Sequence, residues 1–375
     1  MTYPFPDVYR QEIFPVEPPR FLTGVPVFLG YAEAGPVDQP VLLHLWPQFG
    51  AAFGEPLADG YLATAVQGFF ENGGQVCYVV RLDDGNTLTS LVSLRQGLTA
   101  VSALDNIDLI CAPDIARSKE LAGVLALQNE LLSHCARLGD RFALLDTAVN
   151  ANRETAIEQR AGLNSSYGAL FYPWLKIINS EGVATAVPPC GHIAGIYARS
   201  DRAVGVHKAP ANEVVNGILS LQTSLSKTDQ TELFANNVNY LRPFTGRGIR
   251  VWGARTLSQD PTWQYVNVRR LFITVGRWLE QFMTQLPFEP NDARLWVRIV
   301  REVNAYLNGV YQRGALKGQT PEQAFYVKCD PETNPPEVRA AGQVVARIGV
   351  AAAVPGEFID VRIIRGSSGV SISIK

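Results

Sequence analysis

Residues 188–212, PPCGHIAGIYARSDRAVGVHKAPAN, gather the residue types that most often carry out chemistry in proteins. The segment holds one cysteine, an aspartate and two of the four histidines of the chain. As a nucleophile, the thiol of Cys190 would need His192 or His207 as its base and Asp201 to orient that base. One cysteine and two histidines are also residue types that bind zinc. The segment therefore raises two hypotheses, a cysteine hydrolase and a metal site.

Neither pattern is complete. Cys190 and His192 are two residues apart, which places them on one face if the segment is a strand, but prolines flank the pair. Cysteine hydrolases draw this pair from distant segments, and a zinc site needs a fourth ligand and a tighter spacing. The favoured interpretation is structural, with glycines that allow close backbone approach and charged residues that form ion pairs. The glycines are Gly191, Gly195 and Gly205, and the charged residues are Arg199, Asp201 and Arg202.

Motifs for cofactor binding are absent from the sequence. No G-x-x-x-x-G-K-[ST] or H-E-x-x-H occurs, and GRGIRVWG at residues 246–253 lacks the G-x-G-x-x-G spacing of a dinucleotide site. We therefore expect no cofactor, no metal and no enzymatic activity. A cysteine hydrolase centred on Cys190 and His192 is kept as the alternative function.

The composition points to self-association. The chain has 375 residues, 47% of them hydrophobic and only 18% charged, as expected when much surface is buried against other copies. A net charge of -2 argues against nucleic acid, and no apolar run is long enough to span a membrane. The first residues lack the pattern of a secretory signal. Five scattered cysteines without a C-x-x-C pair fit reduced thiols, so we expect assembly in the cytoplasm.

Apolar strands alternate with helices between residues 21 and 235. Strands are expected at 25–32, 75–82, 106–114 and 141–148, and helices at 61–71 and 118–138. Asn72-Gly73-Gly74 should end the first helix, while Ser118 should cap the second and Gly139 should close it. This alternation predicts an α/β domain with a largely parallel sheet covered on both faces.

The pattern changes after residue 236. Asp260-Pro261 should open a helix that runs to about residue 286, and a second helix is expected at 293–311. Residues 242–317 hold 12 Lys/Arg and 5 Asp/Glu, a balance of +7 in a chain of -2. The tryptophans between these arginines are also consistent with a nucleic-acid surface, but helices whose arginines form ion pairs or line a protein interface are favoured. Two β-prone stretches, 357–365 and 370–375, flank the hinge or hairpin at 366–369.

The first 20 residues are rich in proline and exclude a long helix. Residues 7–14 are consistent either with a single extended strand that joins a sheet elsewhere or with a frayed terminus. We therefore divide the chain into an N-terminal arm (1–20), an α/β domain (21–235) and a C-terminal assembly domain (236–375).

Several blocks, in order along nearly the whole chain, resemble one protein family. The opening YPFPDVYRQEI is similar to YPGVYVEEI, although it is two residues longer. TGVPVFLGYAEAGPVDQPVLLHLWPQFGAAFGE, AVQGFFENGGQVCYVVRL, ALFYPWL and VPPCGHIAGIYARSDRAVGVHKAPAN follow. LRPFTGRGIRVWGARTL, YVNVRRL, GALKGQTPEQAFYVKCD and PGEFIDVRI complete the set. In these blocks the chain resembles the contractile tail sheath proteins of phages and contractile injection systems.

The resemblance implies a central domain likened to the subtilisin-type α/β fold and a C-terminal α+β domain completed by strands from extended arms. Stacked hexameric rings of such subunits surround an inner tube and contract to drive it through a target envelope. Implied partners are the chain itself, the tube protein, and baseplate and cap proteins, without nucleic acid or membrane insertion, in a phage tail or tail-like particle.

By the same resemblance, the arms pair as strands with other subunits (β-augmentation), and the C-terminal domain faces the tube. The arm residues are Asp7, Val8, Tyr9, Arg10, Gln11, Glu12 and Ile13 at one end, and Val370, Ser371, Ile372, Ser373 and Ile374 at the other. The expected tube contacts are Arg313, Lys317 and Lys328.

Overall fold

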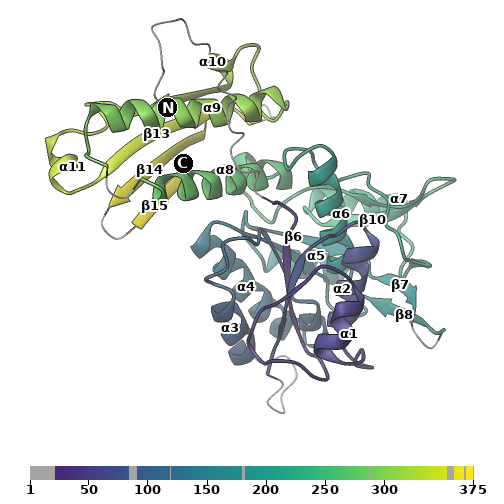
Figure 1. Ribbon diagram of the computed structural model, residues 1–375. Helices are drawn as coiled ribbons and strands as arrows, with labels where there is room; N and C mark the ends of the chain where they lie inside the picture. Colours follow the sequence, from purple (N-terminus) through teal and green to yellow (C-terminus); the bar gives the residue numbers. More distant parts are fainter. Residues whose placement is uncertain are drawn as a thin grey trace, which may run out of the picture.

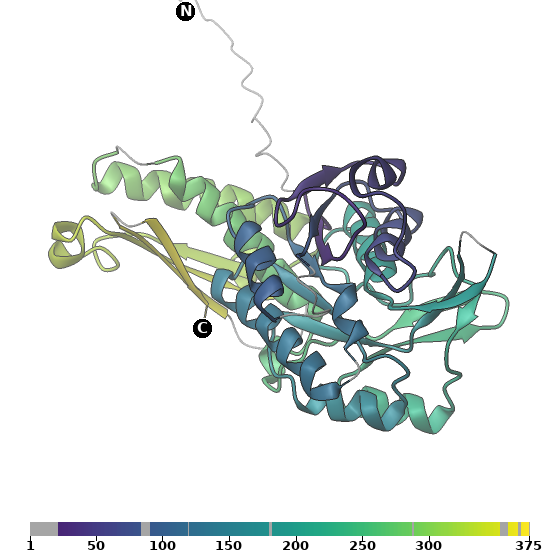
Figure 2. The same ribbon diagram turned by 90° about the horizontal axis from the view of Figure 1, so that it is seen from below.

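The computed structural model describes residues 22–83, 91–118, 120–179, 182–286, 289–352, 359–366 and 369–374. Its described residues form two parts, a large sheet domain and a smaller C-terminal domain, which Figure 1 shows side by side. Seen from below, the C-terminal domain extends from one side of the sheet domain (Figure 2).

The sheet domain is built on eight strands in the order β11-β10-β6-β5-β4-β1-β3-β2. The central strands β3, β1, β4, β5, β6 and β10 run parallel, and antiparallel β2 and β11 form the two edges. The strand bounds are β1 Pro26–Gly30, β2 Val41–Leu43, β3 Cys77–Arg81, β4 Leu109–Cys111, β5 Phe142–Asp146, β6 Gly168–Tyr172, β10 Asn239–Phe244 and β11 Gly248–Trp252. The largely parallel α/β sheet that the sequence predicts is confirmed.

Helices cover both faces of this sheet because its strands are apolar on both sides. On one face α2 (Leu62–Glu71), α6 (Cys190–Ala203) and α1 (Pro47–Phe53) pack with Phe28 of β1 in one core cluster. On the other face α3 (Leu91–Ala100) and α4 (Leu121–Leu138) pack with Val27 and Leu29 of the same strand. The bounds of the remaining elements are α5 Arg153–Ala161, α7 Lys227–Ala235 and η1 Pro113–Arg117. A small sheet, β8-β7-β9, consists of Ala184–Val187, Leu175–Ile178 and Ser220–Leu221.

The C-terminal domain packs helices on a four-stranded antiparallel sheet in the order β12-β13-β14-β15. Its strands are Phe325–Lys328, Val344–Val350, Ile359–Gly366 and Gly369–Ile374, and its long helices are α8 (Val266–Thr284) and α9 (Ala293–Gln312). Short helices α10 (Pro321–Ala324) and α11 (Pro336–Ala340) lie in the connections. Helix α8 belongs to both domains, since Val266 and Ile273 join the core of the sheet domain while Leu279 and Met283 join the C-terminal core.

Three sequence predictions differ from the structure. Ser118 does not cap α4, which begins after Glu120, although Gly139 ends it in the left-handed conformation as expected. Asp260 accepts a hydrogen bond from Thr262 N and caps the short 3-10 helix η2 (Pro261–Trp263), so α8 starts only at Val266. The large sheet also continues past the expected boundary at residue 235, because β10 pairs in parallel with β6.

Candidate functional site

The segment at residues 188–212 contains helix α6, which begins at Cys190 and ends at Ala203. The backbone N–H of Cys190 donates to Asp146 Oδ1 at 2.8 Å, so the last residue of β5 satisfies a free amide at the start of the helix. A carboxylate is favoured at this position because the helix N-terminus carries partial positive charge. Burial raises the pKa of Asp146 to about 7, against the opposing effect of its hydrogen bonds from Cys190.

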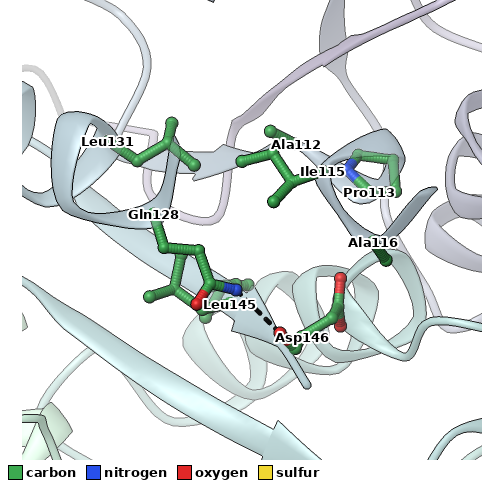
Figure 3. A pocket seen from close by; sticks show the side chains of 9 residues that line it. Ala112, Pro113, Ile115, Ala116, Gln128, Leu131, Leu145 and Asp146 are labelled. Carbon is green, nitrogen blue, oxygen red and sulfur yellow. Dashed lines mark hydrogen bonds between the residues drawn. The ribbon is translucent and has the colours of Figure 1, made fainter. Parts of the chain in front are cut away.

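The space beside Asp146 is too small for a substrate. Ligands of open α/β sheets bind at the carboxyl ends of the strands, which here are the ends of β4 and β5. The cavity at this point has a volume of about 10 Å³, room for about one water. In Figure 3, Gln128 reaches across it, and its Nε2 donates to the Asp146 carbonyl at 2.7 Å. The chain's own side chains thus fill the place where related folds hold a ligand.

Cys190 and His192 do not form a catalytic pair. The sequence left a strand open, but the two residues lie on a helix, where side chains two positions apart do not face each other. Both are buried, and burial raises the pKa of the Cys190 thiol while it lowers the pKa of His192 to about 4. At neutral pH the nucleophile would be a thiol, and its expected base is sealed from substrate.

Gly191 and Gly195 serve close backbone packing, as predicted, whereas Gly205 has a φ of 127° and a Cβ there would meet the ring of His207 and no backbone. A Cβ on Gly191 would lie 2.1 Å from the Ala65 carbonyl oxygen of α2, and one on Gly195 would lie 2.3 Å from that of Phe69. From the other side, a Cβ on Gly68 would lie 2.4 Å from the His192 ring. The backbone of α6 thus approaches α2 closely at Gly191 and Gly195, and the His192 ring packs on the backbone of α2 at Gly68.

The expected ion pairs are present in part. Asp201 binds Arg270 of α8, and Arg199 lies 3.6 Å from Glu213. Arg202 instead donates to the carbonyl oxygen of Gly73, which corrects the expectation of an ion pair for this residue. In the part of the chain that the structure describes, no three potential metal ligands come together. Within the same ranges, no helix has the length and apolar character needed to cross a membrane.

The basic segment 242–317 is not one surface. Arg269, Arg270 and Arg277 of α8 are buried at the junction of the two domains. Burial alone lowers the pKa of Arg270, but the carboxylates of Asp201 and Asp108 raise it above its ordinary value. Sequence reasoning counted these arginines as surface charge and missed the role of Arg270. The available signal was a pair of adjacent arginines inside the otherwise apolar run VRRLFITV.

The C-terminal strand Val370–Ile374 pairs within its own chain, which differs from the expected pairing with another subunit. β15 is antiparallel to β14, with Val370 opposite Arg365 and Ile374 opposite Val361. Only two residues separate β14 from β15, a length that favours pairing with the nearest strand of the same chain. β15 is the outermost strand of the described sheet, so its far edge has no partner strand there. The other expected arm, Asp7–Ile13, lies outside the described residues.

The three expected tube contacts lie around α10. Arg313 follows α9 and is exposed, and Lys317 is exposed while its backbone N–H donates to the Ala351 carbonyl at 2.9 Å. Lys328 ends β12 and forms ion pairs with Glu332 and Asp330 of its own chain. Arg313 and Lys317 are thus available at the surface, whereas Lys328 is engaged with internal partners.

Comparison with known proteins assigns the chain to a family. The family model for the phage tail sheath protein central domain matches residues 96–257, and that for the phage tail sheath C-terminal domain matches residues 258–364. A tail sheath protein of Salmonella phage ViI is 30% identical over 262 residues, which are 67% of this chain and 41% of that protein. The chain belongs to the phage tail sheath protein family, and it spans about two fifths of the length of this relative.

Solved structures of similar length agree along almost the whole chain. A chain of the cryo-EM structure of the anti-feeding prophage baseplate is 27% identical, with a TM-score of 0.76 over 96% of this chain and 98% of that chain. The sheath complex of the PVC extracellular contractile injection system, in its contracted state, is 28% identical with a TM-score of 0.73. That match covers 96% of this chain and 97% of the other. These neighbours are components of sheath and baseplate assemblies.

Proposed function

We propose that the protein is the structural subunit of a contractile sheath. It assembles as stacked hexameric rings around an inner tube and contracts to drive that tube through a target envelope. The observation that carries this proposal is the match over 96% of the chain to a sheath complex in the contracted state. Chains that adopt two packings can store energy at assembly and release it without nucleotide.

The sheet edges provide the means of assembly. Among the described strands none pairs with the far edge of β15, and a strand from another subunit that adds there would join the chains by main-chain hydrogen bonds. In the assembly, residues 370–374 and the N-terminal arm would then take part in sheets shared between subunits. Tube, baseplate and cap proteins are the other partners, and the particle would be a phage tail or a tail-like injection system put together in the cytoplasm.

Electron microscopy of the purified protein tests this proposal. We expect long hollow cylinders with six subunits in each ring. A protein that stays monomeric at every concentration and salt condition, and that forms no cylinders when mixed with tube, would contradict the proposed function.

The proposed function is not enzymatic. Cys190 is buried, its thiol is protonated, and the cavity at the end of the sheet holds about one water. Cys190→Ser keeps the size of the side chain, so the variant should fold and build the same cylinders as the wild type. A hydrolase activity that the wild-type protein shows and folded Cys190→Ser lacks would instead support the cysteine hydrolase.

A further inference from the structure

One buried guanidinium joins the two domains. Arg270 Nη1 donates to Asp201 Oδ1 at 2.9 Å, and its Nη2 donates to Asp201 Oδ2 at 2.6 Å and to Asp108 Oδ2 at 2.8 Å. The side chains of Arg270, Asp108 and Asp201 are only 2%, 3% and 1% exposed. A two-pronged contact of this kind fixes direction as well as distance, because the guanidinium is planar.

The same two carboxylates also contact the first described residues of the sheet domain. Asp108 Oδ1 accepts a hydrogen bond from Val25 N at 2.7 Å, and the hydroxyl of Thr23 beside Asp201 lowers the pKa of that carboxyl against the effect of burial. Between them Gly24 has a φ of 73°, and a Cβ there would lie 2.4 Å from Cα of Ala198 on α6. Residues 23–25 are therefore fastened at the point where the chain enters the sheet domain.

Helix α8 carries this connection into the C-terminal domain. Arg270 lies near the start of α8, and farther along the helix a Cβ added to Gly276 would lie 4.0 Å from Cδ1 of Ile372 in β15. A second contact, from Arg277 Nη2 to the Asp105 carbonyl at 2.7 Å, ties α8 to the residues just before β4. A cleft of about 240 Å³ lined by Leu22, Thr23, Gln75 and Arg202 lies along the fastened segment.

We propose that Arg270 is a positioning residue that couples residues 23–25 to α8, and through α8 to the C-terminal sheet. Tension on the chain that precedes Leu22 then passes through Asp108 and Asp201 to Arg270. This inference rests on the proposed function, in which the N-terminal arm is held by another subunit. In that setting, one ion cluster links the arm at one end of the chain to the sheet edge at the other.

Amide hydrogen exchange of the isolated, purified protein tests the coupling. Arg270→Met leaves two buried carboxylates without their cation, so exchange at the Val25 amide should rise on the order of tenfold or more. Arg269→Met is the matched control, because Arg269 is also buried on α8 but stacks on Trp263 and Tyr167 and binds no carboxylate. The control should leave exchange at Val25 unchanged.

The reverse perturbation sharpens the test. Thr23→Val removes the hydroxyl beside Asp201, and exchange in the first turns of α8 should then rise. If Arg270→Met fails to fold, Arg270→Lys retains the charge but loses the planar fork, and it should raise exchange at Val25 to a smaller extent. Unchanged exchange at Val25, an equal rise in Arg269→Met, or a uniform rise over all segments would each overturn the coupling.

These outcomes are independent of the proposed function. If the wild-type protein builds no cylinders but Val25 responds to Arg270→Met as expected, the sheath proposal fails and the coupling stands. If cylinders form and Val25 does not respond, the coupling fails and the sheath proposal stands.

Discussion

Helix α6 and strand β15 are the two regions that the sequence marks most clearly, and the structure uses them in opposite ways. Helix α6 carries the residue types of an active site, yet Cys190, His192 and Asp201 are buried against α2, β5 and α8. Strand β15 carries no reactive side chain, yet it lies at the margin of its sheet. The comparison teaches that reactive side-chain types in a buried helix can serve packing alone, whereas the edge of a sheet can offer a binding surface without any reactive side chain.

The largest expected effect on stability comes from adding a side chain where the backbones of α2 and α6 are in contact. Gly191→Ala places a methyl group 2.1 Å from the Ala65 carbonyl oxygen, so the helices must separate. We expect the free energy of unfolding to fall by about 3 kcal/mol, measured by chemical denaturation. Gly50→Ala in α1 is the control, because nothing lies within 4 Å of its new Cβ and alanine favours helix. A tolerated Gly191→Ala would contradict the packing role of this segment.

Removing the edge strand should have a smaller effect on folding and a complete effect on assembly. Deleting residues 370–375 removes the partly buried Val370 and Ile372 but leaves most of the C-terminal core, so stability should fall by about 2 kcal/mol. The remaining chain should be a folded monomer by size-exclusion chromatography and circular dichroism, and micrographs should show no cylinders. Sheaths of normal length after this deletion would refute the assembly role of β15.

A third test uses the pH dependence of the free energy of unfolding, to which the buried Asp146 and His192 should contribute with opposite signs. The pKa of Asp146 is raised to about 7, so between about pH 4 and 7 the folded state binds a proton that the unfolded state has lost. This group therefore makes stability fall as pH rises through that window. Asp146→Asn removes the effect and should shift the slope of unfolding free energy by about +1.4 kcal/mol per pH unit relative to wild type.

His192 should shift the slope in the other direction. Its pKa is lowered to about 4, so between about pH 4 and 6.5 the unfolded state binds the extra proton and stability falls on acidification. His192→Gln should change the slope by about -1.4 kcal/mol per pH unit relative to wild type. Urea titrations at several pH values measure both slopes. Equal slopes in Asp146→Asn, His192→Gln and wild type would show that neither group is buried as described.

The smallest expected effect on stability is that of the exposed charges near α10. Arg313→Glu with Lys317→Glu should change the free energy of unfolding by less than about 0.5 kcal/mol, because both residues are exposed. Self-polymerisation should persist, but assembly on tube should be impaired, since surface charges set the register of partners. Arg95→Glu with Lys227→Glu makes the same charge change on the sheet domain as a control. Tube-filled particles at wild-type yield from the first double variant would refute the placement of the tube contact.

The sequence allowed those parts of the fold to be predicted that depend on local patterns. The apolar strands and the alternation with helices predict the sheet, and Gly139 ends α4 because a glycine tolerates positive φ there. The glycines of α6 could likewise be assigned to close packing. The helical state of Cys190 could not, because prolines precede it and the helix depends on Asp146, 44 residues away, to accept its first amide.

The misplaced features depend on long-range contacts. The partners of Arg270 lie 69 and 162 residues away, so the apolar run around it could indicate burial but not which carboxylates it binds. The predicted boundary at residue 235 excluded β10 from the sheet domain. β10 pairs in parallel with β6 across a connection of more than 60 residues, and hydrophobic periodicity cannot reveal a pairing over that distance. For β15, the sequence predicts a strand but not its partner, since an alternating segment fits any open edge.

The burial of the five cysteines has a consequence for how the protein behaves in an oxidising medium. All five are buried and unbonded, and burial raises the pKa of the thiols of Cys77, Cys135, Cys190 and Cys329. Oxidants attack the exposed thiolate, and these groups are neither exposed nor ionised at neutral pH. A sheath of this chain would therefore pass from a reducing to an oxidising medium without cross-links between subunits. In the contractile sheath proposed above, the absence of such cross-links would leave the subunits free to move past one another during contraction.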